Sequence, residues 1–253
     1  MIRIASIQTD VVFNDPAANA AVAAQELALA AADGAQLAVF PEAFFTGYCV
    51  DDFEEAMSIG ISRSSDAVQA FVQSCADNDV IGIAGFVERD DKLLYNAAVI
   101  AEPGVAPRYY RKTHLPDLGV DKFVLPGGSL DVFDTKHGRI GVLICFDQRM
   151  PEPARVLALR GAEIIALPTN WPEGAECSAN YICVARAAEN RVFMVASNRV
   201  GAEKGFPFIG KSKIIDVVGN ILAEAGTAPT RLIADVDLAQ ARQKRTITVP
   251  GKF

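Results

Sequence analysis

Short apolar runs alternate along the chain with longer segments in which hydrophobic residues recur at helical spacing. The apolar runs predict strands at 2–8, 37–40, 80–87, 93–101, 108–112, 140–144, 164–168, 192–196, 210–215, 221–225 and 232–236. Helical spacing predicts helices at 16–32, 65–76, 152–160 and 179–190. No linker or internal repeat interrupts this order. We therefore expect one α/β domain spanning residues 1–253, with mixed sheets that need cover on both faces.

The segment 139–155, RIGVLICFDQRMPEPAR, joins a predicted buried strand to a predicted helix. The apolar run ends at Cys145, a polar turn follows, and Pro151 is placed near the helix start. A cysteine in this position would expose its sulfur beside the N–H groups of a helix start, where a thiolate is stabilised. Cys145 could equally be a small hydrophobic residue of the core. This segment alone does not decide between a nucleophile and a core thiol.

Two further polar residues follow predicted strands. Glu42 comes after the run LAVF and lies among aromatic residues, whose low polarity would raise the pKa of a carboxyl group towards that of a general base. Lys112 ends a strand beside Arg111, and neighbouring side chains of a strand point to opposite faces, so one of the two points inward. Taken separately, an exposed loop acid and a surface basic pair are the more ordinary interpretations. Together with Cys145 they would supply a base, a stabilising cation and a nucleophile.

The composition narrows the possible classes of function. Of the residues 51% are hydrophobic, the net charge is −7, and no run of lysine or arginine occurs, so the sequence gives little support for nucleic-acid binding. The first residues lack the pattern of a signal peptide, and no apolar run reaches the roughly 18 residues of a membrane span. Five cysteines without CxxC pairs predict reduced thiols in the cytoplasm. His114 and His137, the two histidines, lack neighbouring ligands, so we expect no metal.

Three segments resemble the signatures of the carbon–nitrogen hydrolase family, the nitrilase superfamily. They are VFPEAFFTGY around Glu42, YRKTHLP around Lys112 and GVLICFDQRMPEPAR around Cys145, in the family's order, and softer matches such as YNAAV at Tyr95 add to them. The resemblance implies a four-layer αββα sandwich of two mixed sheets covered by helices. It also implies a homodimer or a higher even-numbered homo-oligomer that exchanges C-terminal arms, here residues 243–253.

The family's mechanism assigns a role to each matched position. The resemblance implies that Glu42 is the general base, that Cys145 is the nucleophile, and that Lys112 and the backbone N–H of Phe146 stabilise the oxyanion. A small amide would then be hydrolysed by water through a thioester, releasing ammonia or an amine and a carboxylic acid. No cofactor and no metal are needed for this reaction.

The residues after the nucleophile indicate the branch of the family. Nitrile-hydrolysing members usually have Trp-Glu there, whereas this chain has Phe146 and Asp147, as in amidases and carbamoyl hydrolases. We therefore expect an amide substrate, with an N-carbamoyl amine or amino acid as the alternative and a nitrile less favoured. Arg149 is interpreted either as a structural residue of the turn or as a ligand for a substrate carboxylate. Other residues expected at the pocket are Tyr48, Asn170 and Trp171, of which Trp171 could instead be a packing residue.

The chain departs from the family at one position. Many members carry a glutamate shortly before an FxPG-like segment, but LGVDKFVLPGG contains none. Asp121 is the nearest acid, offset by one residue, and we hypothesise that it takes over the positioning role. Asp117 is a weaker candidate.

Two rival interpretations remain open. A papain-like Cys–His hydrolase would need His114 or His137 as its base. A scaffold or binding relative of the family would keep the fold without activity, although the intact Glu42, Lys112 and Cys145 count against it.

Overall fold

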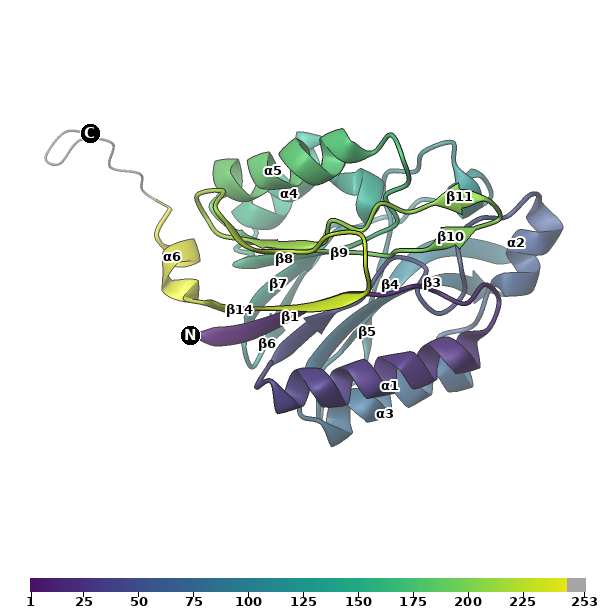
Figure 1. The fold of residues 1–253 in the computed structure, drawn as a ribbon, viewed down its shortest axis with the longest axis horizontal. Helices are drawn as coiled ribbons and strands as arrows, with labels where there is room; N and C mark the ends of the chain where they lie inside the picture. The colour runs from purple at the N-terminus through teal and green to yellow at the C-terminus, as the bar shows by residue number, and fades with distance from the viewer. Residues whose placement is uncertain (245–253) are drawn as a thin grey trace, which may run out of the picture.

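The computed structural model describes residues 1–244 and contains two six-stranded sheets packed face to face between helices (Figure 1). The strands of the first sheet, in spatial order, are β14 (Thr230–Val236), β1 (Ile2–Gln8), β2 (Leu37–Val39), β3 (Ile81–Asp90), β4 (Leu93–Ala101) and β5 (Arg108–Arg111). Those of the second sheet are β13 (Ile221–Glu224), β12 (Lys213–Ile215), β9 (Phe193–Asn198), β8 (Ile164–Thr169), β7 (Gly138–Val142) and β6 (Val132–Thr135). A separate hairpin joins β10 (Ala202–Glu203) to β11 (Phe206–Pro207).

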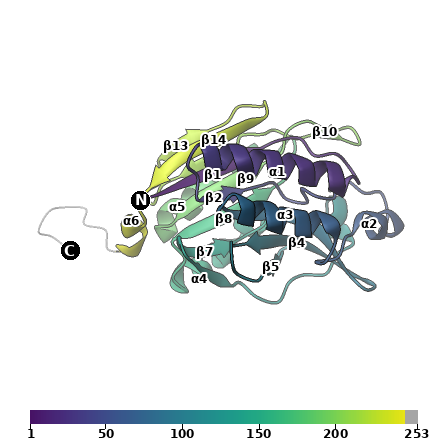
Figure 2. The same ribbon diagram turned by 90° about the horizontal axis from the view of Figure 1, so that it is seen from below.

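Both sheets are mixed. Strands β1, β2 and β3 run parallel in the first sheet and β7, β8 and β9 in the second, while the outer strands pair antiparallel. Helices α1 (Pro16–Ala32) and α3 (Asp66–Asp77) cover the first sheet, and α4 (Pro151–Leu159) and α5 (Cys183–Asn190) cover the second (Figures 1 and 2). The predicted four-layer αββα sandwich is thereby confirmed. Two shorter helices are α2 (Phe53–Ile59) and α6 (Leu238–Arg242).

Buried apolar side chains fill the space between the sheets and the space beneath each helical layer. Ile4, Ile83 and Val195 belong to the central layer, where the inner faces of both sheets meet. Leu27 of α1 packs on the outer face of the first sheet, and Leu157 of α4 on that of the second. Burial of one such side chain contributes about 1.5–3 kcal/mol. Because each sheet is covered on both faces, its central strands are continuous apolar runs, which explains why the sequence pattern located them.

Several elements differ from the prediction. The strand before Cys145 ends at Val142 instead of residue 144, and a 3-10 helix, Cys145–Arg149, carries the cysteine. The predicted helix 179–190 begins as a π-helical turn, Ser178–Ile182, and becomes α-helical only in α5. Helix α2 and strands β6, β10 and β11 were not predicted, because they are short and carry no strong hydrophobic period.

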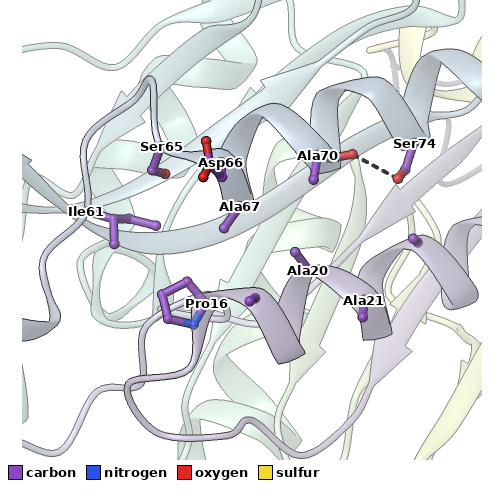
Figure 3. Close-up of a pocket in the computed structure, with 11 residues that line it drawn as sticks. Pro16, Ala20, Ala21, Ile61, Ser65, Asp66, Ala67, Ala70 and Ser74 are labelled. Carbon is purple, nitrogen blue, oxygen red and sulfur yellow. Dashed lines mark hydrogen bonds between the residues drawn. The ribbon is translucent and has the colours of Figure 1, made fainter.

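A groove of about 530 Å³ lies on the outer helical layer, between α1 and α3 (Figure 3). Its walls are mostly alanine, and the hydroxyl of Ser74 is satisfied by the carbonyl of Ala70 at 2.8 Å. None of the predicted site residues lines this groove.

Two observations concern the limits of the chain. Among residues 1–244, no helix is long and apolar enough to cross a membrane. The predicted C-terminal arm, 243–253, lies outside the described residues except for Gln243 and Lys244.

Candidate active site

Three residues predicted from strand ends follow the carboxyl ends of strands from both sheets. Glu42 comes three residues after β2, and its N–H donates to the carbonyl of Thr169 at the end of β8, at 3.4 Å. Lys112 directly follows β5, and its N–H donates to the carbonyl of Asn96 in β4 at 2.8 Å. Cys145 follows β7 of the second sheet. The candidate catalytic residues therefore lie where the two sheets meet, at the carboxyl ends of their strands.

A closed ring of hydrogen bonds joins Glu42, Lys112, Asn96 and Asp121. Lys112 Nζ donates to Glu42 Oε1 at 2.7 Å and to Asp121 Oδ2 at 2.6 Å. Asn96 Nδ2 donates to the same Glu42 oxygen at 2.7 Å and to Asp121 Oδ1 at 2.9 Å. All four side chains are buried. One ammonium thus lies between two carboxylates in a buried environment, where screening by solvent is weak and their attraction is strong.

Within residues 1–244, one of the two carboxylate oxygens of Glu42 has no hydrogen-bonding partner. Its Oε1 is held by Lys112 and Asn96, whereas its Oε2 is buried and has no hydrogen-bonding partner among the described residues. Burial raises the pKa of Glu42, and the negative charge of Asp121 adds to that rise while Lys112 opposes it. Glu42 is therefore a stronger base than an exposed glutamate.

Lys112 remains a cation in this cluster. Burial would lower its pKa, but the carboxylates of Asp121 and Glu42 outweigh burial, and the pKa of Lys112 is raised. A permanently charged ammonium can stabilise an anion that forms beside it without first acquiring a proton.

Cys145 lies at a cavity of about 350 Å³ and is half-buried. Its backbone has a φ of 43°, in the left-handed region that non-glycine residues seldom adopt. Burial raises the pKa of its thiol to about 12, the charge of Glu42 adds to the rise, and Lys112 reduces it. The expectation of a thiolate stabilised by a helix start was wrong for the free protein, because burial and Glu42 outweigh it. The resting sulfur therefore carries its proton and needs a base.

Asp147 fixes the turn that carries Cys145. Its Oδ2 accepts the N–H of Ile144 at 2.9 Å and the hydroxyl of Tyr110 at 2.7 Å. Its Oδ1 accepts the N–H groups of Thr113 at 3.1 Å and of His114 at 2.8 Å. This buried carboxylate thus ties the cysteine turn to the segment that follows Lys112, and it connects the two sheets at the site.

The other predicted site residues divide into two groups. The residues that line the cavity with Cys145 are Tyr48, Phe146, Arg149, Asn170 and Trp171. Asp121 does not line the cavity but lies behind Lys112. Both amide atoms of Asn170 and the indole Nε1 of Trp171 are buried and have no partner among the described residues, so they are free to bind a ligand. Arg149 is exposed and donates to Ser178 Oγ at 3.4 Å, and within residues 1–244 it forms no ion pair with a carboxylate.

A second cavity of about 460 Å³ adjoins the first. The outer cavity extends to Phe206 and Lys204 of the β10–β11 hairpin. The residues that line both cavities are Tyr48, Leu118, Asn170, Pro172 and Glu173. A substrate longer than its reacting group therefore has room to continue outward.

Sequence reasoning missed Asn96 and Asp147 as members of the site. Asn96 is a buried amide in the otherwise apolar strand β4, and an isolated polar residue in such a run was the signal that could have found it. Asp147 was used only to compare branches of the family. Apart from its bond to the Ile144 N–H, its five side-chain contacts join residues more than 30 positions apart, which no local pattern reveals.

The histidines do not form a Cys–His pair. His114 Nδ1 is 3.2 Å from Asp147 Oδ1, and this contact raises its pKa. His137 precedes the five-residue strand β7 and Cys145 follows it, so the two lie beyond opposite ends of a strand that is roughly 16 Å long. Within residues 1–244 no hydrogen bond joins either histidine to Cys145. In the same range, no group of three or more His, Cys, Asp or Glu residues is placed to hold a metal ion.

Comparisons with known proteins agree with this geometry. A model of the carbon–nitrogen hydrolase family matches residues 3–246. A protein named nitrilase from Pyrococcus abyssi is 37% identical, with 97% of this chain and 93% of that protein aligned. A citrullinase from Francisella tularensis is 32% identical over 96% of this chain and 92% of its own length. The solved structure of an amidase, NitN, superposes with a TM-score of 0.86 at 26% identity, covering 97% of this chain and 96% of the other. The chain belongs to the carbon–nitrogen hydrolase family.

Proposed function

We propose that this protein hydrolyses the C–N bond of a small amide through a thioester on Cys145. One observation carries the proposal: a buried Glu42 with one free oxygen and a buried cationic Lys112 lie close enough to Cys145 to shift the pKa of its thiol in opposite directions. These are the base, the oxyanion ligand and the nucleophile of acyl transfer.

The first half of the reaction forms the thioester. Glu42 Oε2 takes the proton of the Cys145 thiol as the sulfur attacks the amide carbon. The oxygen becomes an oxyanion, which Lys112 Nζ and the N–H of Phe146 stabilise. Glu42 then returns the proton to the leaving nitrogen, the C–N bond breaks, and ammonia departs.

The second half restores the enzyme. Glu42 removes a proton from a water molecule, and the resulting hydroxide attacks the thioester carbonyl. The same oxyanion ligands stabilise this second tetrahedral intermediate. When the C–S bond breaks, the sulfur regains a proton from Glu42 and the carboxylic acid leaves. Every proton transfer uses one carboxyl group, which explains why Glu42 needs both a fixed oxygen and a free one.

The cavity supports a small acyl group with polar substituents. Asn170 and Trp171 offer unpartnered hydrogen-bonding atoms to the substrate, and Arg149 offers a positive charge for a carboxylate on it. An N-carbamoyl amine or amino acid is the second candidate, and the named relatives include both a nitrilase and a citrullinase. Phe146 and Asp147 after the nucleophile favour the amide over the nitrile.

The structure of a variant of an amidase from Nesterenkonia sp. AN1 supports the nucleophilic role of the cysteine. In its structure, which is 25% identical to this chain with a TM-score of 0.81, the acetamide moiety of fluoroacetamide is covalently added to the active-site cysteine. In that adduct the sulfur has displaced fluoride and the amide is intact, so the adduct supports a nucleophilic sulfur at the position of Cys145 and is not itself a thioester.

The test is an ammonia-release assay with a panel of amides, N-carbamoyl amines and nitriles, combined with rapid-quench mass spectrometry of the whole protein. We expect release from one or more amides and a mass increase equal to the acyl group, mapped to Cys145. Cys145→Ala should abolish both signals without loss of folding. Absence of ammonia and of any adduct across all three substrate classes would instead favour a scaffold role.

Assembly and location belong to the same proposal. We infer an even-numbered homo-oligomer, supported by exposed apolar side chains on the α4–α5 layer, with Leu159 79% and Tyr181 70% exposed. A cytoplasmic location is supported by the five cysteines, all of which are free.

A further inference from the structure

We propose that Glu203 is a positioning residue that sets the place of Lys112 through the loop that carries Tyr48. This role presupposes the amide hydrolysis proposed above and adds a component to it. Glu203 lies in β10, on a hairpin outside both six-stranded sheets, and it makes no contact with Lys112 itself.

Glu203 holds the backbone of the Tyr48 loop with one oxygen. Its side chain is buried, and its Oε1 accepts the N–H of Tyr48 at 2.7 Å and the N–H of Cys49 at 2.5 Å. Two consecutive N–H groups on one carboxylate oxygen fix the direction of the chain at that point. Gly47 allows this approach, because a Cβ there would lie 3.1 Å from Glu203 Oε2 and 2.5 Å from the Phe13 ring, and its φ is +86°.

Arg199 fixes the other oxygen of Glu203. The guanidinium is fully buried, donates to Glu203 Oε2 at 2.5 Å, and lies 4.4 Å from the centre of the Phe208 ring. It also donates to Asp10 Oδ1 at 2.9 Å and to the carbonyl of Val11 at 3.0 Å. A buried charge is stable only when it is paired, so Arg199 and Glu203 keep each other in one orientation. The carboxylate is therefore a rigid support for the loop.

Tyr48 connects that support to the catalytic cluster. Its carbonyl accepts the N–H of Val120 at 2.9 Å, and its hydroxyl donates to Asp121 Oδ2 at 2.8 Å. The same Asp121 oxygen accepts Lys112 Nζ at 2.6 Å. Glu203 thus acts on Lys112 in three steps, through the Tyr48 backbone, the Tyr48 ring and Asp121.

The role we infer is geometric. Glu203 is paired with Arg199 at 2.5 Å and forms no hydrogen bond with Lys112, so it affects the position of the ammonium more than its charge. An ammonium that is displaced from the oxyanion loses stabilisation in the transition state more than in the substrate complex. Loss of Glu203 should therefore lower kcat more than it raises KM.

A double-mutant cycle tests the route through Tyr48. The four proteins are the wild type, Glu203→Gln, Tyr48→Phe and the double variant, assayed with the best amide from the panel. We expect Glu203→Gln to lower kcat by about tenfold or more, since small misplacements of catalytic groups can cost about 100-fold. In the Tyr48→Phe background, where the hydroxyl link is already absent, the same substitution should cost about twofold or less, because residues in one network are not additive.

Two controls separate positioning from folding. Glu102→Gln changes another buried carboxylate that accepts one backbone N–H, from Lys136, and one arginine, Arg108, but lines neither cavity, and it should leave kcat unchanged. If Glu203→Gln does not fold, Arg199→Met with Glu203→Met removes the loop contact without leaving a buried charge unpaired. This pair should show the same loss of kcat.

Three outcomes would overturn the proposal: equal loss of kcat in both Tyr48 backgrounds, an effect on KM alone, or wild-type kcat in a folded Arg199→Met, Glu203→Met protein. A wild type without amide turnover would contradict the proposed function itself, which keeps the two failures distinct.

Discussion

Lys112 binds two carboxylates, Glu42 and Asp121. One positive charge facing two acidic groups governs which groups of the site are protonated. With Glu42 ionised, the ring carries one positive and two negative charges in a buried environment, so one carboxylate is always incompletely neutralised. The negative charge of Asp121 raises the pKa of Glu42, which makes Glu42 a better proton acceptor. Asp121 therefore has two effects: it holds the ammonium in place and it strengthens the base.

Asp121→Asn should reveal both effects. The substitution weakens a charge-assisted hydrogen bond of about 1.5–3 kcal/mol, so we expect kcat to fall by about 10- to 100-fold. It also removes a charge that raises the pKa of Glu42. Since activity requires ionised Glu42 and increases as pH rises through its pKa, the acid limb of the kcat/KM profile should move to lower pH. The measurement is kcat/KM against pH for both proteins.

Asp117→Asn is the matched control, because Asp117 is exposed in the same connecting segment. It should leave kcat and the acid limb unchanged. Unaltered turnover in Asp121→Asn, or an acid limb that moves to higher pH, would contradict the role given to Asp121.

At the scale of elements, the loop after β2 lies directly against β3. Gly85 N–H donates to the carbonyl of Pro41 at 3.0 Å, and its carbonyl accepts the N–H of Phe45 at 3.2 Å. A Cβ at Gly85 would lie 2.4 Å from the Ala43 nitrogen and 2.6 Å from the Glu42 Cα. The absence of a side chain at Gly85 thus allows the backbone of Glu42 to pack directly against strand β3.

Gly85→Ala should move the loop and its glutamate together. The contacts are with backbone atoms, which cannot rotate away, so we expect overpacking to cost about 1–3 kcal/mol of unfolding free energy. The acid Glu42 would also be displaced from Lys112, so kcat should fall. Gly128→Ala is the control, since a Cβ there meets nothing within 4 Å. Urea unfolding and kcat, measured on both variants, check the prediction, and equal stability of the two would contradict it.

The sequence located the strand ends but not the contacts between them. The apolar runs before Glu42 and Cys145 identified the strands because buried strands need continuous hydrophobic residues. Asp147, Asn96 and Glu203 could not be assigned in this way, because their partners are distant in the sequence: Glu203 meets Tyr48 across 155 positions. A buried polar residue can be suspected from its neighbours, but its partner depends on how the elements are packed.

At the scale of the whole molecule, the site depends on the two sheets staying in register. Ser6 of β1 and Ser197 of β9 share a hydrogen bond of 2.7 Å between the sheets, and the Ser197 hydroxyl also reaches the carbonyl of Val39 at 2.8 Å. Val39 ends β2, three residues before Glu42. These buried hydroxyls provide directional contacts in an otherwise apolar interface, which fixes the alignment that brings Glu42 of one sheet to Cys145 of the other.

The outer surfaces of the two helical layers differ in a way that predicts how copies associate. Leu159 of α4 and Tyr181 beside α5 are 79% and 70% exposed, whereas Leu29 of α1 is 40% exposed. Stable interfaces between copies usually bury at least about 1,200 Å² and have an apolar centre. We therefore expect two copies to pair through their α4–α5 layers. Because α4 follows the Cys145 turn directly, such a contact would also support the site from outside.

Charged substitutions on the two layers test this assembly. The double substitution Leu159→Asp and Tyr181→Asp would place two carboxylates from each copy in the apolar centre of the interface. Burying unpaired charges there is costly. Sedimentation equilibrium should then show a monomer at concentrations where the wild type is dimeric or larger. Leu29→Asp, on the α1–α3 layer, should keep the wild-type mass. A monomeric wild type would show that copies do not associate at all. Dissociation by Leu29→Asp instead would assign the contact to the α1–α3 layer.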